Sequence, residues 1–257
     1  MTYRLKAIPS LADNYIWLLI NDTTATAIII DPGSSQPCED FLDRENICPV
    51  VIPVTHHHWD HVNGVEKLVQ RYNIPVYGPD TEYIPCQTNT VKADDRFRIE
   101  GFDIDFHVMD LSGHTAGHIG YQTEHELFCG DTLFSAGCGR LFDGTAAQLH
   151  AAIQRIARLP LDTTIYCAHE YTLDNLRFAQ AVEPDNTAIQ QRYHEVKKLR
   201  ENNLPSLPFT LEQEMRYNPF LRTDKESIMQ AVAQHSGHNI DNSEDCFRYL
   251  RMWKDGF

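Results

Sequence analysis

The sequence has 257 residues, of which 42% are apolar and 23% charged, and this balance excludes collagen-like, low-complexity and fully disordered chains. Its length predicts one large domain, or one domain with a smaller partner. The 22 Lys and Arg residues stand against 36 Asp and Glu residues, and the resulting net charge of −14 opposes attraction to phosphate, so we expect no nucleic-acid partner.

Apolar runs and cysteines indicate the setting of the protein. The longest uncharged apolar runs, at residues 16–20 and 25–30, fall far short of the ~18 residues of a membrane-spanning helix, so we expect no membrane contact. The first twenty residues lack the pattern of a secretory signal, and the seven cysteines are scattered without a C-x-x-C pair. We therefore expect a cytoplasmic protein with reduced thiols, and a monomer as the default.

Strands dominate the expected elements of the first part of the chain. Residues 15–20 and 26–30 read as a hairpin that leads into the turn Asp31-Pro32-Gly33, and residues 50–54 read as a buried strand. Apolar residues recur at helical spacing from Val62 to Tyr72. Two further hairpins are expected, and their strands are residues 97–99 with 104–108 and residues 120–123 with 127–129.

Helices dominate the expected elements of the last third. Residues 145–159 read as a helix and residues 163–167 as a short strand, after which strand signals stop near residue 170. The two prolines in residues 204–208 predict a surface connection between helices. The order of elements predicts an α/β sheet domain that carries an all-helical C-terminal part.

Histidine is the outlier in composition, with 13 residues, four of which fall within positions 56–61. This cluster sits at the predicted strand-to-helix junction. Positions two apart in an extended segment point the same way, so His56 and His58 can converge on one metal ion. Asp60 and His61 open the following helix and can face a second ion. The alternative interpretation is a solvated His-rich loop.

Four groups in one loop cannot complete two coordination shells, because each ion needs roughly three or four protein ligands. We interpret the intervening His57 and Trp59 as supporting or packing residues. Three later side chains of metal-ligand type each follow an apolar strand-like run, where an α/β sheet gathers a site from distant segments. These side chains are His114, Asp131 and His169.

The order and spacing of these residues resemble the signature of the metallo-β-lactamase superfamily, with H-x-H-x-D-H at residues 56–61 followed by the three later side chains. Residues 130–140, residues 167–172 and the terminal R-M-W-K-D-G-F closely resemble the glyoxalase II, or hydroxyacylglutathione hydrolase, family. This second resemblance runs from residue 8 to the last residue.

The resemblance implies an αββα sandwich with a C-terminal all-helical domain, divided as a catalytic domain at residues 1–170 and a substrate-binding domain at residues 171–257. It also implies two divalent metal ions per chain, with zinc expected first and iron or manganese as alternatives. The implied first ion is held by His56, His58 and His114, and the second by Asp60, His61 and His169, with Asp131 bridging the two. Asp60 and Asp131 are the implied catalytic residues.

The resemblance further implies a glutathione pocket at Arg140, Tyr171, Arg251 and Lys254. Fixed cations and a phenol can hold the two carboxylates of glutathione by charge-assisted hydrogen bonds. A solvated helix face is the alternative for the last two of these residues. Phe142 replaces a tyrosine common in the family, so a hydroxyl contact to glutathione is expected to be missing.

Three more residues are expected to have roles other than binding metal or substrate. Asp31 and His118 are expected to support the ligands by hydrogen bonds, and Cys138 is expected to pack rather than to act as a nucleophile.

The activity that the resemblance implies is hydrolysis of a glutathione thioester, S-D-lactoylglutathione, to D-lactate and glutathione, which serves methylglyoxal detoxification. The first alternative is a glutathione persulfide dioxygenase that uses a single iron ion. The second is a metal-binding module without catalysis, which would leave the cationic positions unexplained.

Overall fold

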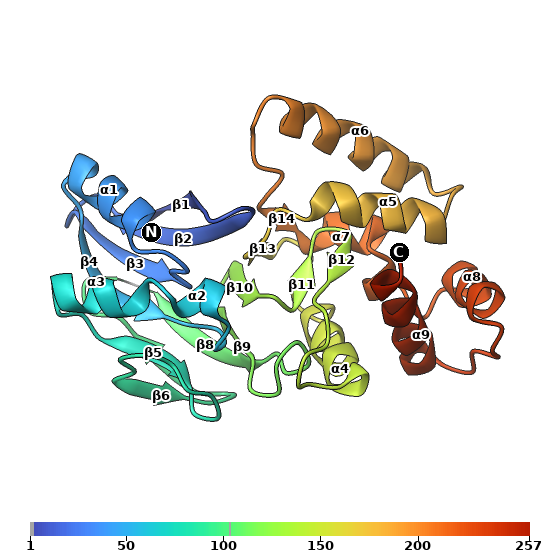
Figure 1. Ribbon diagram of the computed structural model, residues 1–257, viewed down its shortest axis with the longest axis horizontal. Coiled ribbons are helices and arrows are strands. Elements are labelled where there is room, and N and C mark those ends of the chain that lie inside the picture. The colour runs from blue at the N-terminus through green and yellow to red at the C-terminus, as the bar shows by residue number, and fades with distance from the viewer. Residues whose placement is uncertain (1–2, 103) are drawn as a thin grey trace. The chain divides into compact units, whose positions relative to one another are not determined.

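The order of strands and helices follows the hydropathy of the sequence, with strands concentrated in the blue-to-green part of the chain and helices in the yellow-to-red part (Figure 1). The computed structural model describes residues 3–102 and 104–257. Contacts divide the chain into two units. The first comprises Met1–Asp110 and Gly117–Gly130, and the second comprises Leu111–Ala116 and Asp131–Phe257.

The first unit contains a six-stranded sheet in chain order. The strands β1, β2 and β3 pair antiparallel, and β3 to β6 pair parallel. Burial on both sides explains why β2 and β3 read as almost continuous apolar runs. The bounds are β1 (Tyr3–Ser10), β2 (Asn14–Asn21), β3 (Thr26–Ile30), β4 (Cys48–Pro53), β5 (Val76–Pro79) and β6 (Asn89–Val91).

Three helices accompany this sheet: α1 (Gln36–Glu45), α2 (Trp59–Val62) and α3 (Val65–Tyr72). Apolar side chains of α1 and α3, including Phe41 and Leu68, share one buried cluster with strand residues such as Ile16 and Ile20 of β2. Burial of these apolar helix faces therefore fixes both helices against the sheet.

The predicted helix from Val62 to Tyr72 is split at Gly64. The Gly64 N–H donates to Pro32 O at 2.8 Å, and a Cβ at this position would lie 2.6 Å from that oxygen. The close approach of the Pro32 turn therefore separates α2 from α3.

A second sheet of the first unit is built from both predicted hairpins, which are confirmed: β7 pairs with β8 and β9 with β10, all antiparallel. Its strands in this unit are β7 (Arg96–Arg98), β8 (Asp105–Asp110), β9 (Ile119–Gln122) and β10 (Glu126–Gly130). The ring of Tyr77 stacks on Phe97 at 4.7 Å, and the Tyr121 hydroxyl donates to Val54 O at 2.9 Å. These contacts join the two sheets of the unit face to face.

The second unit holds most of the helices. Its strands form the short pairs β11 (Leu133–Phe134) with β12 (Gly137–Cys138) and β13 (Thr164–Cys167) with β14 (Phe209–Thr210). The prediction that strands stop near residue 170 is wrong for β14, because two residues are too few to show a strand pattern. The helices are α4 (Ala146–Ile156), α5 (Thr172–Val182), α6 (Thr187–Glu201), α7 (Leu211–Tyr217), the 3₁₀ helix η1 (Pro219–Leu221), α8 (Glu226–Ser236) and α9 (Ser243–Asp255).

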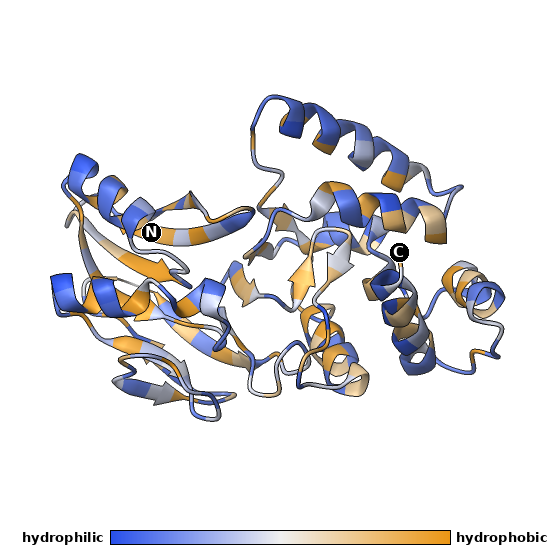
Figure 2. Cartoon of the chain, viewed as in Figure 1, coloured by the Kyte–Doolittle hydropathy of each residue, from blue (hydrophilic) through white to orange (hydrophobic). Residues whose placement is uncertain are grey.

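Amphipathic packing holds these helices together. Leu176 of α5, Val196 of α6 and Tyr217 of α7 share one buried cluster. The remaining surface of α6 is mostly hydrophilic (Figure 2), which explains why only two of its side chains, Ile189 and Val196, are buried. Among the described residues, no helix is long and apolar enough to cross a membrane.

The connection at residues 204–208 departs from its prediction. It breaks the helical pattern as expected, but Ser206 and Leu207 are buried, so the prediction of a surface connection is wrong for its centre. The Ser206 N–H donates to the carboxylate of Glu170 at 2.9 Å, and its hydroxyl bonds the same carboxylate. A partner for the backbone N–H is what allows this polar segment to be buried.

Candidate metal centre

The loop between β4 and α2 alternates buried and exposed side chains. His56 is fully buried and His58 half-buried, whereas His57 and Trp59 are exposed. The ring centroids of His56 and His58 lie 4.7 Å apart, and those of His56 and His61 lie 4.1 Å apart. The extended loop and the first turn of α2 thus bring three imidazoles together within the first unit.

Asp31 anchors this loop from the end of β3. Its carboxylate accepts hydrogen bonds from the Thr55 N–H and hydroxyl, each at 2.7 Å, and contacts His61 Nδ1 at 3.0 Å. Asp31 is 5% exposed. Its φ of 51° is a left-handed backbone conformation that residues other than glycine, Asn and Asp rarely adopt. The strained turn after β3 therefore places one carboxylate beneath the loop.

These contacts assign the tautomers of two histidines. Because Asp31 accepts only, His61 carries its proton on Nδ1 and presents the lone pair of Nε2. The Thr55 hydroxyl donates to Asp31, so it accepts from His56 Nδ1, which lies 3.1 Å away. Both imidazoles are therefore held in the form that a metal ligand needs, with the outer nitrogen protonated and Nε2 as the donor atom.

Asp60 is oriented by the N-terminal end of β2. The side-chain amide of Asn14 donates to Asp60 Oδ2 at 3.1 Å, and the same oxygen lies 3.7 Å from His61 Nε2. Asn14 is 7% exposed, so the amide is fixed by packing. One carboxylate oxygen of Asp60 is thereby directed toward the nitrogen that His61 offers.

Glu82 fixes the backbone between His56 and His58. Its carboxylate, with a side chain 5% exposed, accepts from the His57 N–H at 2.7 Å and from the Gly117 N–H at 3.1 Å, and it contacts His57 Nδ1 at 2.8 Å. A Cβ at Gly117 would lie 2.2 Å from Thr81 Oγ1 and 2.7 Å from Glu82 Cγ, so a larger residue here would displace these side chains. The His57 side chain therefore pairs with Glu82, and its predicted supporting role stays a prediction.

The second unit brings together the three later candidates. His114, Asp131 and His169 are each at most 6% exposed. Asp131 Oδ2 lies 3.5 Å from His114 Nε2 and 3.3 Å from His169 Nε2. His114 Nδ1 donates to Arg140 O at 2.8 Å, so its tautomer also presents Nε2. One carboxylate oxygen and two imidazole nitrogens thus converge inside this unit.

The chemistry and spacing of these donors fit a divalent metal ion. Ligand atoms that hold one ion tetrahedrally at about 2.0–2.2 Å lie roughly 3.3–3.6 Å from one another. The two distances to Asp131 Oδ2 fall in that range. The chain therefore offers imidazole and carboxylate donors of the kind that bind zinc, iron or manganese.

The four predicted glutathione contacts differ in their surroundings. Tyr171 is 37% exposed, and its ring stacks on His169 at 4.7 Å and 6°. The Arg140 side chain is 67% exposed and pairs with Asp255 at 3.6 Å. Arg251, in contrast, is 3% exposed, and its guanidinium donates to Cys138 O at 2.9 Å and contacts the Asp255 carboxylate at 3.1 Å.

Lys254 lies against aromatic rings in the second unit. Its ammonium nitrogen is 5.1 Å from the ring centroid of Phe178 and 5.9 Å from that of Phe257. Burial, and secondarily the charge of Arg251, lower the pKa of Lys254 from 10.5 to about 8. Lys254 is therefore mostly protonated at neutral pH and loses its proton in mildly alkaline solution.

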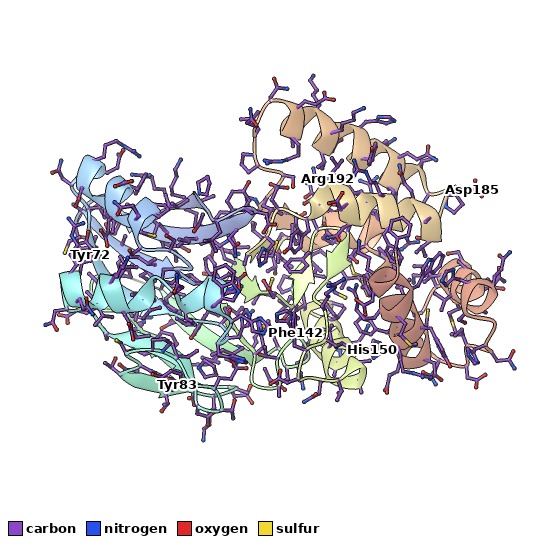
Figure 3. The ribbon with its side chains drawn as sticks, viewed as in Figure 1. Tyr72, Tyr83, Phe142, His150, Asp185 and Arg192 are labelled. Atoms are coloured by element: carbon purple, nitrogen blue, oxygen red, sulfur yellow. The ribbon has the colours of Figure 1, made fainter. Side chains whose placement is uncertain are left out.

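The remaining predicted residues have clear surroundings. His118 is buried and stacks on His56 at 4.5 Å. Phe142, labelled in Figure 3, is 64% exposed, and its ring centroid lies 5.1 Å from that of His114 in a T-shaped arrangement. Burial raises the pKa of Cys138 to about 11, so its sulfur is a thiol at neutral pH and a poor nucleophile.

Sequence reasoning missed the side-chain contacts of Asn14, Glu82 and Glu214. Glu214 is fully buried and bonds the Ser135 hydroxyl at 2.7 Å. A signal for it exists, because Leu211, Glu214 and Tyr217 form one helical face and a carboxylate on an apolar face needs a partner. Asn14 and Glu82 give no such signal, since their partners are distant in sequence.

Comparisons with known proteins identify the family of the chain. The family model of the hydroxyacylglutathione hydrolase C-terminus matches residues 170–257, and that of the metallo-beta-lactamase superfamily matches residues 13–169. A hydroxyacylglutathione hydrolase of Aeromonas hydrophila subsp. hydrophila is 46% identical and covers 99% of this chain and 100% of its own length. One of Aliivibrio salmonicida is 47% identical and covers 98% of this chain and 99% of its own.

Solved structures share the fold. The crystal structure of ETHE1 from Myxococcus xanthus matches with a TM-score of 0.67 at 21% identity and covers 99% of this chain and 98% of that chain. The BLEG-1 B3 metallo-beta-lactamase matches with a TM-score of 0.65 at 24% identity and covers 85% of this chain and 99% of that chain. The predicted metallo-β-lactamase fold with a C-terminal helical region is confirmed.

Proposed function

The chain belongs to the hydroxyacylglutathione hydrolase family of the metallo-β-lactamase superfamily, and on this premise we propose that it hydrolyses S-D-lactoylglutathione to D-lactate and glutathione. The observation that carries the proposal is the likeness to full-length relatives of that name, which includes the C-terminal helical part. The proposed division of labour is a catalytic domain at residues 1–170 and a substrate-binding domain at residues 171–257.

We propose that the chain binds two divalent metal ions and that zinc is the preferred metal. The tautomers set by Asp31, Thr55 and the Arg140 carbonyl support this assignment. When bound, such ions lower the pKa of water toward neutrality and polarise a carbonyl group. The proposed ligands are His56, His58 and His114 for one ion, Asp60, His61 and His169 for the other, and Asp131 for both.

The side chains of this chain would then position the reacting groups and transfer a proton during hydrolysis. The oxygen of water attacks the thioester carbonyl carbon, the carbon–sulfur bond breaks, and glutathione leaves as a thiolate. Asp60, which Asn14 orients, is proposed to accept the proton of the attacking water and to return it to the thiolate. Asp131, between two imidazoles, is proposed to fix the positions of His114 and His169.

The substrate is proposed to be recognised through its glutathione half. Arg140 and Tyr171 are exposed and Lys254 is half-buried, and their polar groups are of the kind that can bind the two carboxylates. Arg251, on the same helix as Lys254, is proposed to contribute to glutathione binding. Its hydrogen bond to the Cys138 carbonyl gives it a structural role as well. Phe142 offers a ring and no hydroxyl, so glutathione would lack one contact at this position.

Thiol release from S-D-lactoylglutathione by protein of known metal content tests the proposal. A matched thioester without the γ-glutamyl and glycyl carboxylates serves as the control substrate. Turnover that needs metal and collapses on the control supports both the reaction and the pocket. Absence of turnover at full metal content, or oxygen uptake with glutathione persulfide, would reject the proposed reaction in favour of another member of the superfamily.

A further inference from the structure

The hairpin of β11 and β12 turns at Ser135 and Ala136. Ala136 has a φ of 57°, a left-handed conformation that costs a residue with a Cβ roughly 1 kcal/mol or more. Leu133 pairs with Cys138 and Phe134 with Gly137, and a two-strand ribbon of this length is not stable alone. Contacts from elsewhere in the second unit must therefore hold the turn.

Glu214 of α7 supplies such contacts. One carboxylate oxygen accepts from the Ser135 hydroxyl at 2.7 Å, and the other accepts from the Ala136 N–H at 2.7 Å. Asn218 donates to this second oxygen at 2.9 Å. Burial raises the pKa of Glu214 above its ordinary value, and the hydrogen bonds from these donors offset part of that rise.

Asn218, at the end of α7, adds further side-chain hydrogen bonds to the hairpin. Its side-chain amide lies 3.0 Å from Phe134 O and 3.1 Å from Gly137 O, the carbonyls on either side of the turn. The amide of Asn175 donates to Ser135 O at 3.1 Å. Four consecutive residues of the hairpin are thus bonded by buried side chains of the C-terminal helices.

The two ends of the hairpin adjoin the candidate ligands. Asp131 lies two residues before β11, and Arg140 O, two residues after β12, accepts from His114 Nδ1. The Gly139 N–H donates to Thr132 O at 3.1 Å and ties the two ends together. A Cβ at Gly139 would lie 2.0 Å from Asp131 O, so the ends are in close contact and cannot shift independently.

We propose that Glu214 is a positioning residue for metal binding: by holding the Ser135–Ala136 turn, it sets the place of Asp131 and of the carbonyl that orients His114. This inference rests on the proposed function, because that function makes these two residues ligands. It assigns to α7 a part in building the metal centre, in addition to any part of the C-terminal helices in binding substrate.

Two substitutions of Glu214 separate positioning from folding. Glu214→Leu removes every acceptor for the turn, and Glu214→Gln keeps an amide oxygen for the Ala136 N–H and an amide group for the Ser135 hydroxyl. The matched control is Glu212→Leu, an exposed position on the same helix. The measurement is the dissociation constant for Zn²⁺, obtained by competition with a chromophoric chelator on folded protein, together with the melting temperature.

We expect Glu214→Leu to weaken Zn²⁺ binding about tenfold, within the range known for residues that orient ligands. Glu214→Gln should recover most of that loss, and Glu212→Leu should bind as the unchanged protein does. A Glu214→Leu variant with a lower melting temperature but unchanged affinity would overturn the proposal, since it would show a structural role alone.

If Glu214→Leu fails to fold, Ser135→Ala decides, because it removes the hydroxyl that donates to Glu214 and leaves the carboxylate in place. Weaker Zn²⁺ binding by folded Ser135→Ala supports the proposal, and unchanged binding contradicts it. The affinity readout needs no substrate. A protein that binds Zn²⁺ but does not cleave the thioester would therefore reject the proposed function without deciding this inference.

Discussion

Asp31 and His61 are joined by a 3.0 Å contact between Oδ2 and Nδ1, and the same carboxylate holds the backbone N–H and the hydroxyl of Thr55. One buried acid therefore sets both the tautomer of a candidate ligand and the path of the loop that carries two others. Local sequence shows only that Asp31 belongs to an Asp-Pro-Gly turn, and it does not show these contacts.

Replacement of Asp31 by Asn should weaken metal binding about 10- to 100-fold, because the amide presents a donor to groups that all need an acceptor. Metal retained after dialysis against a weak chelator measures the effect. Asp22→Asn is the control, since Asp22 pairs with Arg4 at the surface. Equal retention by both variants would show that Asp31 does not orient the ligands.

Glu82 and His57 form a pair whose members should differ in importance. Glu82→Gln disturbs two backbone N–H groups of the candidate site, whereas His57→Ala removes only an exposed side chain. We expect Glu82→Gln to lower kcat about tenfold or more and His57→Ala to change it less than about threefold, in line with the effect of residues that support ligands. Thiol release at saturating substrate compares them, and a larger effect of His57→Ala would refute the assignment.

Arg251 and Arg140 should separate into structural and binding roles. Arg251→Met leaves the carbonyl of Cys138 without its charged donor and should lower the free energy of unfolding by about 2–3 kcal/mol. Arg140→Met removes an exposed cation and should raise KM with little change in stability. Urea unfolding and steady-state kinetics on both variants check this, and equal stability losses would contradict it.

Lys254 predicts a pH dependence of substrate binding. Its pKa, lowered to about 8 by burial, means that the ammonium charge is present below this pH and is lost as the pH rises through it. KM for the glutathione thioester should therefore increase between about pH 7 and pH 9. Lys254→Arg keeps its charge throughout and should remove the increase. An identical KM profile for both proteins would exclude Lys254 from carboxylate binding.

The lowered pKa of Lys254 also predicts how the free energy of unfolding changes with pH. Because the pKa of Lys254 is lower in the folded chain than its ordinary 10.5, the unfolded chain binds more protons between about pH 8 and 10.5. The contribution of Lys254 to stability thus rises with pH across this window and is unfavourable below it. Thermal unfolding of the unchanged protein and of Lys254→Met at about pH 7 and pH 9.5 tests the sign.

Local patterns were sufficient for most of the fold. The β2–β3, β7–β8 and β9–β10 hairpins each combine alternating or continuous apolar residues with a turn signal, and pairing between neighbours needs nothing more. The break at Gly64 and the strand β14 depend on contacts with Pro32 and β13, which no local window contains.

The candidate site divides along the same line. Side chains such as His56 and His58 were predictable because metal chemistry restricts residue type and spacing. Asn14, which bonds Asp60, and Glu82, which bonds the His57 N–H, are ordinary polar residues whose role comes from three-dimensional proximity alone. The predicted metal and substrate residues themselves remain predictions that the experiments above can decide.

Thr55 is held at its N–H and hydroxyl by Asp31 and at its carbonyl by the Ile119 N–H, at 3.0 Å. The segment that carries the histidines is thus ordered by the sheets on which it rests. Conformational entropy that a flexible loop would lose on capturing an ion has already been lost during folding. Affinity for a metal at this loop is consequently tied to the global stability of the first unit, and its backbone amides should exchange with solvent as slowly as those of the neighbouring strands.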